Sequence, residues 1–201
     1  MNWLIASNNH GKSGDLRACL AYYGLTAECY DRYFSRLTFP AETTSSYVTN
    51  AVTKARFAAQ RLGQPVIADD SGIEIPALPG QLGVTTARDL GVAVSGFQRN
   101  QEILTALTTC PNSHRQATMW ATLAAAWPDG HAVWAQGSLS AYISSSQLGT
   151  HSGGFDRIFW LPAYGRTLAE LPAVWRIPLT HRGQAARRLV RQLQALKGSV
   201  S

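Results

Sequence analysis

The chain has 201 residues, of which 45% are hydrophobic and 15% charged, a composition that fits one globular domain or two closely packed lobes and excludes a disordered chain. Its 18 Lys and Arg against 12 Asp and Glu give a net charge of +6, which attracts polyanions such as nucleic acids and phosphorylated metabolites. No apolar run approaches the length of a signal-peptide core or a membrane span, so we expect a cytoplasmic protein.

The first part of the chain predicts a strand, a polar turn and a helix. Residues 2–6 resemble a short buried strand, and the polar residues 7–11 separate them from a helical pattern over 12–23. Gly24 is typical of a helix end, and residues 26–32 fit a second strand. The polar turn would lie at the carboxyl edge of a sheet.

The next segment leads to the only adjacent pair of acidic residues. Residues 39–46 form a loop, and the apolar positions of 47–62 follow a helical period that ends at Gly63. Residues 65–68 then predict a strand whose carboxyl end runs directly into Asp69-Asp70-Ser71-Gly72.

The middle of the chain is rich in turns and strands. Residues 80–96 are turn-rich, and residues 98–107 resemble a short helix. Residues 116–127 and 132–142 are two long β-rich runs, and the Pro-Asp-Gly segment at 128–130 between them is a strong hairpin signal.

The last part holds a glycine-rich loop at 148–155 and a helix that begins after Thr180. The sequence contains no internal repeat, no low-complexity tract and no long linker. The order of elements predicts an α/β fold, with a central mixed sheet flanked by helices, a β-rich second lobe inserted in the middle of the chain, and the active-site cleft between the lobes.

Asp69 and Asp70 are the first candidates for a metal site. Two adjacent carboxylates at the end of an apolar strand repel each other and lose hydration, and a bound cation offsets that cost. The alternative is an ordinary turn, because Asp and Ser often precede Gly in turns.

Glu42 by itself is interpreted as an exposed loop residue. Together with an aspartate, however, it would provide enough protein ligands for Mg²⁺, which takes one or two protein carboxylates plus phosphate oxygens and water.

The polar turn after the first strand is a candidate phosphate-binding loop. Its backbone N–H groups and the start of the following helix face a ligand at the sheet edge, and Lys12 adds a positive charge. The segment lacks the GxxxxGK[ST] spacing of a P-loop, and a helix N-cap formed by Ser7 or Asn9 is the alternative.

Other cations and an aromatic residue complete the candidates. Lys54 lies on an alanine-rich helix, where it faces either a ligand or solvent. His181 and Arg182 begin the last helix and are able to donate to a purine carbonyl, although such a pair is usually a surface feature. Phe155 and Asp156 follow two glycines, where they would stack on a base and accept from it, or serve as a core anchor.

A further pattern runs through nearly the whole chain. Its six segments are Ser7-x-Asn9-x-x-Lys12, Glu42 with Asn50-Ala51-x-x-Lys54-Ala55, residues 65–72 (PVIADDSG), Gly83-Val84-x-Thr86-Ala87-Arg88, Thr167-x-Ala169-Glu170-Leu171 and Thr180-His181-Arg182-Gly183-x-Ala185. In this order and spacing they resemble the inosine triphosphate pyrophosphatase family, which removes deaminated purine nucleotides. The resemblance implies one pyrophosphatase domain of two lobes over residues 1–201.

The resemblance also implies a role for each candidate. Glu42 and Asp70, assisted by Asp69, would hold Mg²⁺, and Asp70 would be the general base that orients water for attack on the α-phosphorus. The residues implied in substrate binding are Ser7, Asn8, Asn9, Lys12, Lys54, Ser71, Gly154, Phe155, Asp156, Arg176, His181 and Arg182.

Several positions depart from the family pattern, mainly at the end that would contact the base. They are Thr49 in place of an acidic residue, Gly153 in place of an aromatic, Arg157 in place of a proline and Arg176 in place of a lysine. The departures leave the preferred base open.

The implied activity is Mg²⁺-dependent hydrolysis of non-standard purine nucleoside triphosphates, such as ITP, dITP and XTP, to the monophosphate and pyrophosphate. The resemblance further implies a homodimer, and neither a membrane nor a nucleic acid is expected as a partner. A 6-keto purine presents an acceptor where adenine presents a donor, so His181 or Arg182 would favour inosine or xanthine. The alternatives are a related pyrophosphatase for another modified nucleotide, or a basic nucleic-acid-binding protein, which would leave the acidic pair without a purpose.

Overall fold

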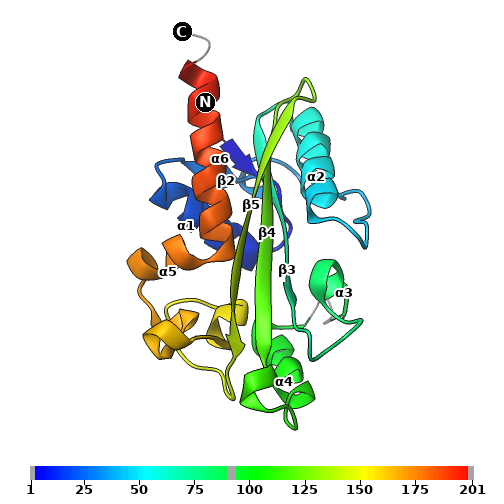
Figure 1. The fold of residues 1–201 in the computed structure, drawn as a ribbon. Coiled ribbons are helices and arrows are strands. Elements are labelled where there is room, and N and C mark those ends of the chain that lie inside the picture. The colour runs from blue at the N-terminus through cyan, green and yellow to red at the C-terminus, as the bar shows by residue number, and fades with distance from the viewer. Residues whose placement is uncertain (1–2, 90–93, 199–201) are drawn as a thin grey trace. The chain divides into compact units, whose positions relative to one another are not determined.

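The computed structural model describes residues 3–89 and 94–198, and Figure 1 shows its elements. The strands are β1 (Trp3–Ile5), β2 (Ala27–Cys29), β3 (Val66–Glu74), β4 (Gln116–Ala126), β5 (Ala132–Ile143), β6 (Phe159–Leu161) and β7 (Arg166–Thr167). The helices are α1 (His10–Tyr22), α2 (Tyr47–Leu62), α3 (Thr86–Asp89), α4 (Gly96–Ala106), α5 (Ala173–Leu179) and α6 (His181–Gly198). Short 3-10 helices are η1 (Tyr30–Arg32), η2 (Gly83–Thr85), η3 (Asn112–His114), η4 (Gly154–Arg157), η5 (Pro162–Tyr164) and η6 (Leu168–Glu170). None of the helices in these described ranges is long and apolar enough to span a bilayer.

The strands form one seven-stranded sheet in the order β2-β1-β3-β4-β5-β6-β7. β1 is parallel to β2, with Trp3 opposite Ala27, and parallel to β3, with Leu4 opposite Val66. β6 is antiparallel to both β5 and β7. The sheet is therefore mixed, and the predicted α/β fold is confirmed.

The chain divides into two compact units. The first contains residues up to 71, residues 121–138 and residues from 180 onward, and the second contains 72–120 and 139–179. α1, α2 and α6 belong to the first unit, whereas α4, α5 and η4 belong to the second. β3, β4 and β5 contribute residues to both units.

In the first unit, α2 packs on the sheet through small side chains. Ala51, Ala55 and Ala58 recur at helical spacing, are fully buried, and belong to a cluster with Leu4 of β1 and Val66 of β3. Figure 1 shows α2 on one side of these strands and α1 and α6 on the other. Helices on both faces thus bring α1, α2 and α6 against the strand that carries the two aspartates.

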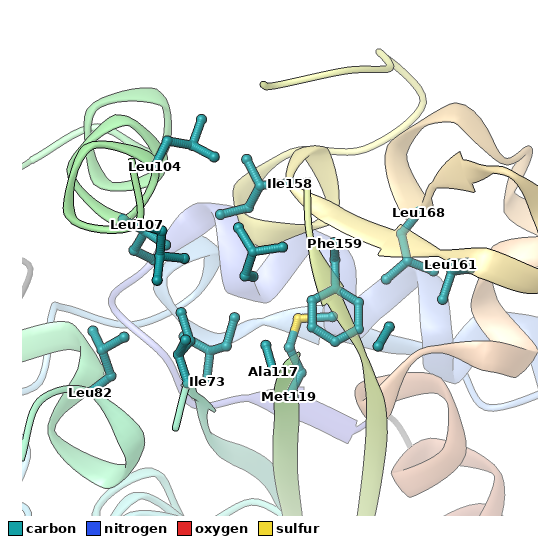
Figure 2. Close-up of a cluster of buried hydrophobic side chains, with 14 of the residues drawn as sticks. Ile73, Leu82, Leu104, Leu107, Ala117, Met119, Ile158, Phe159, Leu161 and Leu168 are labelled. Atoms are coloured by element: carbon teal, nitrogen blue, oxygen red, sulfur yellow. The ribbon is translucent and has the colours of Figure 1, made fainter. Parts of the chain in front are cut away.

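The second unit has its own hydrophobic core, which Figure 2 shows. Leu104 of α4 and Leu107, the residue that follows α4, point toward Ile158, the residue that follows η4. Packing of this kind holds the helix against the 3-10 turn that carries Phe155 and Asp156.

Two boundaries differ from the sequence prediction near the candidate residues. β3 continues to Glu74, so Asp69 and Asp70 lie within a strand, and both the turn interpretation and the predicted strand end were wrong. The strand continues because hydrogen-bond partners compensate the buried carboxylates. α1 begins at His10, and the side chain of Asn9 accepts from the Lys12 N–H at 3.1 Å, which confirms the N-cap alternative for Asn9.

Candidate active site

The turn between β1 and α1 is held in shape by its own side chains. Ser7 Oγ accepts from the Asn9 N–H at 3.2 Å. Asn8 Oδ1 accepts from the Tyr30 hydroxyl at 2.5 Å, and its amide donates to the Leu37 carbonyl at 2.9 Å. These bonds fix the backbone of the turn at the N-terminus of α1, where the helix dipole favours an anion.

Asp69 is buried and bound to an arginine. Its Oδ2 accepts from Nη2 of Arg182 at 3.0 Å and from the Ser71 hydroxyl at 3.3 Å. Burial alone would raise the pKa of Asp69, but the positive charges of Arg182 and Lys12 outweigh it and lower that pKa to about 2. Asp69 is therefore ionised at neutral pH.

Asp70 has a different environment, because successive side chains of a strand point to opposite faces. Its carboxylate accepts from Nδ2 of Asn50 at 2.8 Å and from the Ser71 N–H at 3.0 Å. Burial raises the pKa of Asp70, and the Glu42 carboxylate adds to the rise, whereas the hydrogen bond from Asn50 and the charge of Lys54 oppose it. Asp70 is thus a stronger proton acceptor than an ordinary carboxylate.

Two lysines face these carboxylates. Lys54 Nζ forms an ion pair with Glu42 Oε1 at 2.7 Å and donates to the Asp69 carbonyl at 3.2 Å. Lys12 Nζ donates to the Ser71 carbonyl at 3.4 Å. Burial lowers the pKa of Lys12, whereas burial of Lys54 is outweighed by the charges of Asp69 and Glu42, which raise its pKa. The predicted lysines and carboxylates therefore lie together in the first unit.

The start of α6 adds a buried arginine and a buried histidine. Nη1 of Arg182 pairs with Asp15 of α1, and Nη2 donates to Asp69 and, at 2.9 Å, to the Ser71 hydroxyl. Arg182 therefore joins α1, β3 and α6. Burial lowers the pKa of His181 to about 3, so its ring is neutral at physiological pH, and its Nδ1 has no hydrogen-bond partner among the described residues.

A glycine in β5 allows α6 to begin this close to the sheet. A Cβ at Gly137 would lie 2.2 Å from the His181 carbonyl oxygen and 2.7 Å from the Ala185 nitrogen. In addition, Gln184 Nε2 donates to the Ser138 carbonyl at 2.8 Å. The missing side chain at position 137 thus sets the place of the first turn of α6.

The second unit holds the remaining candidates. Asp156 Oδ2 pairs with Nη1 of Arg176 at 3.2 Å and accepts from the Ser152 hydroxyl at 2.7 Å. Phe155 is half-buried and packs against the core of this unit, as expected for a core anchor. Gly154 has a φ of +59°, a left-handed conformation that glycine adopts without strain.

Two residues that bind side chains of this site were not among the site residues predicted from the sequence. Asn50 lies one helical turn before Lys54, and Asp15 lies three residues after Lys12. Side chains three or four positions apart share one face of a helix. That spacing is the signal that identifies both, once one residue of each helix is assigned to the site.

The donor set fits a hard cation that takes few protein ligands. Within residues 3–89 and 94–198, no group of three or more His, Cys, Asp or Glu side chains is arranged to hold a metal ion by itself. Glu42 and Asp70 instead bring two like charges near each other, and part of the rise in the pKa of Asp70 comes from this repulsion. A divalent cation would relieve it and complete its shell with phosphate oxygens and water.

Comparison with known proteins assigns the chain to a family. The model of the Ham1 family matches residues 3–192, and the chain belongs to this family. A dihydroneopterin triphosphate diphosphatase of Limosilactobacillus reuteri is 36% identical over 193 residues, which cover 96% of this chain and 97% of the relative. A dITP/XTP pyrophosphatase of Thermus thermophilus is 35% identical over 190 residues, which cover 94% of this chain and 90% of the relative.

Solved structures agree with the sequence relatives. A Ham1 protein from Coxiella burnetii matches with a TM-score of 0.77 at 30% identity, over 97% of this chain and 99% of that one. A nucleoside-triphosphatase, described as a dITP/XTP pyrophosphatase, from Mycobacterium abscessus matches with a TM-score of 0.64 at 30% identity, over 98% of each chain. The family resemblance predicted from the six sequence segments is thereby confirmed.

Proposed function

We propose that this nucleoside-triphosphate pyrophosphatase of the Ham1 family hydrolyses non-standard purine nucleoside triphosphates, namely ITP, dITP and XTP, with Mg²⁺ as its metal. The proposal rests on one observation. The carboxylates of Glu42 and Asp70 lie near the ammonium groups of Lys12 and Lys54 in the first unit. Carboxylates of this kind bind a divalent cation, and the ammonium groups neutralise the polyphosphate that the cation accompanies. The dITP/XTP pyrophosphatases among the relatives support the substrate class.

Asp70 is the proposed general base. Asn50 and the Ser71 N–H orient its carboxylate, and without bound metal burial raises its pKa. It accepts a proton from the water that attacks the α-phosphorus, the bond from that phosphorus to the bridging oxygen breaks, and pyrophosphate leaves. Lys12 and Lys54 bind the phosphate oxygens on which negative charge grows.

Glu42 and Asp70 are the proposed metal ligands, and Mg²⁺ bound there supplies further neutralisation of the phosphate charge. Asp69 assists indirectly. Because its Oδ2 already accepts from Arg182 and Ser71, the Asp69 carboxylate fixes the arginine and adds negative charge to the region.

Base selection is proposed to rest on five of the candidate residues, which are Phe155, Asp156, Arg176, His181 and Arg182. In the second unit, the half-buried Phe155 is the proposed stacking residue, and the Asp156–Arg176 pair offers an acceptor and donors. In the first unit, His181 is neutral and Arg182 is charged. Hydrogen-bond donors at these positions favour the 6-keto group of inosine or xanthine over the amino group of adenine.

Pyrophosphate release across a panel of nucleoside triphosphates tests the proposal. We expect kcat/KM for ITP, dITP and XTP to exceed that for ATP by about 100-fold or more, because an amino group facing a donor leaves buried polar atoms unpaired. Chelation of divalent cations should stop turnover of every substrate. Equal rates for all bases, or release of orthophosphate in place of pyrophosphate, would contradict the proposal.

A second candidate substrate is dihydroneopterin triphosphate. The relative from Limosilactobacillus reuteri, at 36% identity, carries that activity in its name. The departures at Gly153 and Arg157 flank the turn of Phe155, so they alter the ring-binding side and leave the residues facing the triphosphate unchanged. Dihydroneopterin triphosphate therefore belongs in the same panel, and a kcat/KM above that of ITP would assign it as the substrate.

A further inference from the structure

Asn100 of α4 is fully buried and reaches the loop that carries Phe155. Its Nδ2 donates to the Gly154 carbonyl at 2.8 Å and to Gln147 Oε1 at 3.0 Å. Burying an amide is unfavourable unless hydrogen bonds compensate the lost hydration. Both hydrogens of Nδ2 are used here to join a helix to two points of the 147–154 segment.

The network fixes which end of the Asn100 amide faces the loop. Gln147 Nε2 donates to the Phe97 carbonyl at 3.1 Å, so Gln147 presents its oxygen to Asn100. The Gly154 carbonyl only accepts. Both neighbours of Nδ2 are acceptors, and a reversed amide would set oxygen against oxygen. Within the part of the chain that the structure describes, Oδ1 of Asn100 has no hydrogen-bond partner, so its donor end makes the bonds.

The turn needs such a constraint at its glycine end. Gly153 and Gly154 precede Phe155, and glycine loses more backbone freedom on ordering than any other residue. At the far end of the turn, Asp156 is held by Ser152 and by the ion pair to α5. The bond from Asn100 supplies the matching restraint on Gly154.

α4 is itself held in place by its N-terminal cap and by packing in the core. Ser95 and Gln98 form a reciprocal capping box at the start of the helix. Leu104 on the same helix and Leu107 at its C-cap point into the core beside Ile158 (Figure 2). Asn100 therefore transmits the position of a capped and packed helix to the backbone of the turn.

We propose that Asn100 is a positioning residue for base recognition, which holds the Gly154 carbonyl and so sets the orientation in which Phe155 and Asp156 meet the nucleobase. The inference rests on the proposed function, because it takes these two residues as base contacts. It predicts that Asn100 affects binding of the nucleoside part of the substrate and not binding of the polyphosphate part.

Two variants test this role. Asn100→Leu keeps the approximate volume without a donor, and Asn100→Asp keeps the shape but replaces the donor with an acceptor. For the best substrate of the panel, we expect KM to rise about tenfold in both, with kcat changed less than about threefold, because one buried hydrogen bond is lost outside the reacting centre. The inhibition constant of inorganic tripolyphosphate, which has no base, should stay at the wild-type value.

Gln147→Ala is the matched control. It removes the neighbouring acceptor but leaves the bond from Asn100 to Gly154, so its KM should stay within about twofold of wild type. Thermal unfolding of each variant identifies any that do not fold. If Asn100→Leu does not fold, Asn100→Ser is used in its place.

The outcomes separate this inference from the proposed function. An unchanged KM in folded Asn100 variants overturns the positioning role, and so does a KM in Gln147→Ala as high as in Asn100→Leu. A rise in the tripolyphosphate inhibition constant equal to the rise in KM also overturns it. If the wild-type protein releases pyrophosphate from no compound of the panel, the proposed function fails and the inference fails with it.

Discussion

Asp69 and Asp70 are chemically identical neighbours with opposite shifts in pKa. The charge of Arg182 helps to hold Asp69 ionised down to about pH 2, whereas burial and the charge of Glu42 raise the pKa of Asp70. The strand produces this difference, because its alternation sends one carboxylate toward α6 and the other toward α2. Asp70 of the metal-free protein should therefore take up a proton as the pH falls through a pKa above the usual 3.8.

The substitution Asp70→Asn tests the role of this residue directly. We expect kcat to fall by about 10²–10⁴-fold, because an amide of the same shape does not accept the proton from water. Mg²⁺ should raise the Tm of the wild-type protein and raise that of the variant much less, because a ligand stabilises the folded state only where it binds.

The control for this experiment is Asp129→Asn. Asp129 is an exposed residue of the turn between β4 and β5, and its Oδ1 accepts from the His131 N–H at 2.9 Å, a bond that asparagine retains. This variant should match wild type in kcat and in the Tm shift. Near-normal turnover by Asp70→Asn would remove Asp70 from the mechanism.

At the scale of elements, long periodic segments were predictable from the sequence. The helix expected over 47–62 is α2, with the Ser46 side chain at its start and Gly63 in a left-handed conformation at its end. The hairpin expected at 128–130 joins β4 to β5, and Gly130 has a φ of +87°. Period and capping residues are local properties, so the sequence alone carries them.

Elements that depend on distant partners were not predictable. β3 was expected to end before Asp69, because carboxylates and glycine are poor strand formers, but Asn50 and Arg182 compensate them from α2 and α6. β6 and β7 have three and two residues, too few for a periodic signal, and α5 contains Pro178. The pair between Asp15 and Arg182 joins residues 167 positions apart, which only the fold reveals.

Gly137→Ala tests whether β5 positions the start of α6. The added Cβ would lie 2.2 Å from the His181 carbonyl oxygen, a contact with backbone that no side-chain rotation relieves. We expect a loss of stability of about 1–3 kcal/mol, as for overpacked cores, together with a lower kcat/KM because His181 and Arg182 move.

Gly14→Ala provides the comparison. Gly14 also belongs to the first unit but lies in the helix α1, and a Cβ there meets nothing within 4 Å. It should stabilise the protein by up to about 1 kcal/mol, because alanine favours the helix. Stability in urea unfolding and kcat/KM are measured for both variants. Equal effects of the two substitutions would show that the close approach at position 137 does not position the start of α6.

At the scale of the whole molecule, buried ionisable groups link folding to pH. The folded-state pKa of Asp69 is about 2, below its usual 3.8, so its stabilising contribution is complete above 3.8 and is lost as the pH falls toward 2. The pKa of His181 is about 3, below its usual 6.5, so the unfolded chain binds a proton first and stability declines as the pH falls from 6.5 to 3. Asp70 acts in the opposite direction, because its pKa is raised on folding.

His181→Gln isolates one of these contributions. Burial is the main cause of the lowered pKa of His181, the charges of Arg182 and Lys12 add to it, and those of Asp15 and Asp69 oppose it. Below pH 6.5, the free energy of unfolding of the wild type should therefore fall relative to that of the variant, by a slope that approaches about 1.4 kcal/mol per pH unit, because unfolding takes up one proton at this site. Urea unfolding from neutral pH to about pH 5 measures the free energy of unfolding of both proteins. The carboxylates contribute equally to both, so their contributions cancel in the difference. Parallel curves over that range would mean that folded His181 binds its proton as readily as the unfolded chain does, and that its ring is not held neutral beside Arg182.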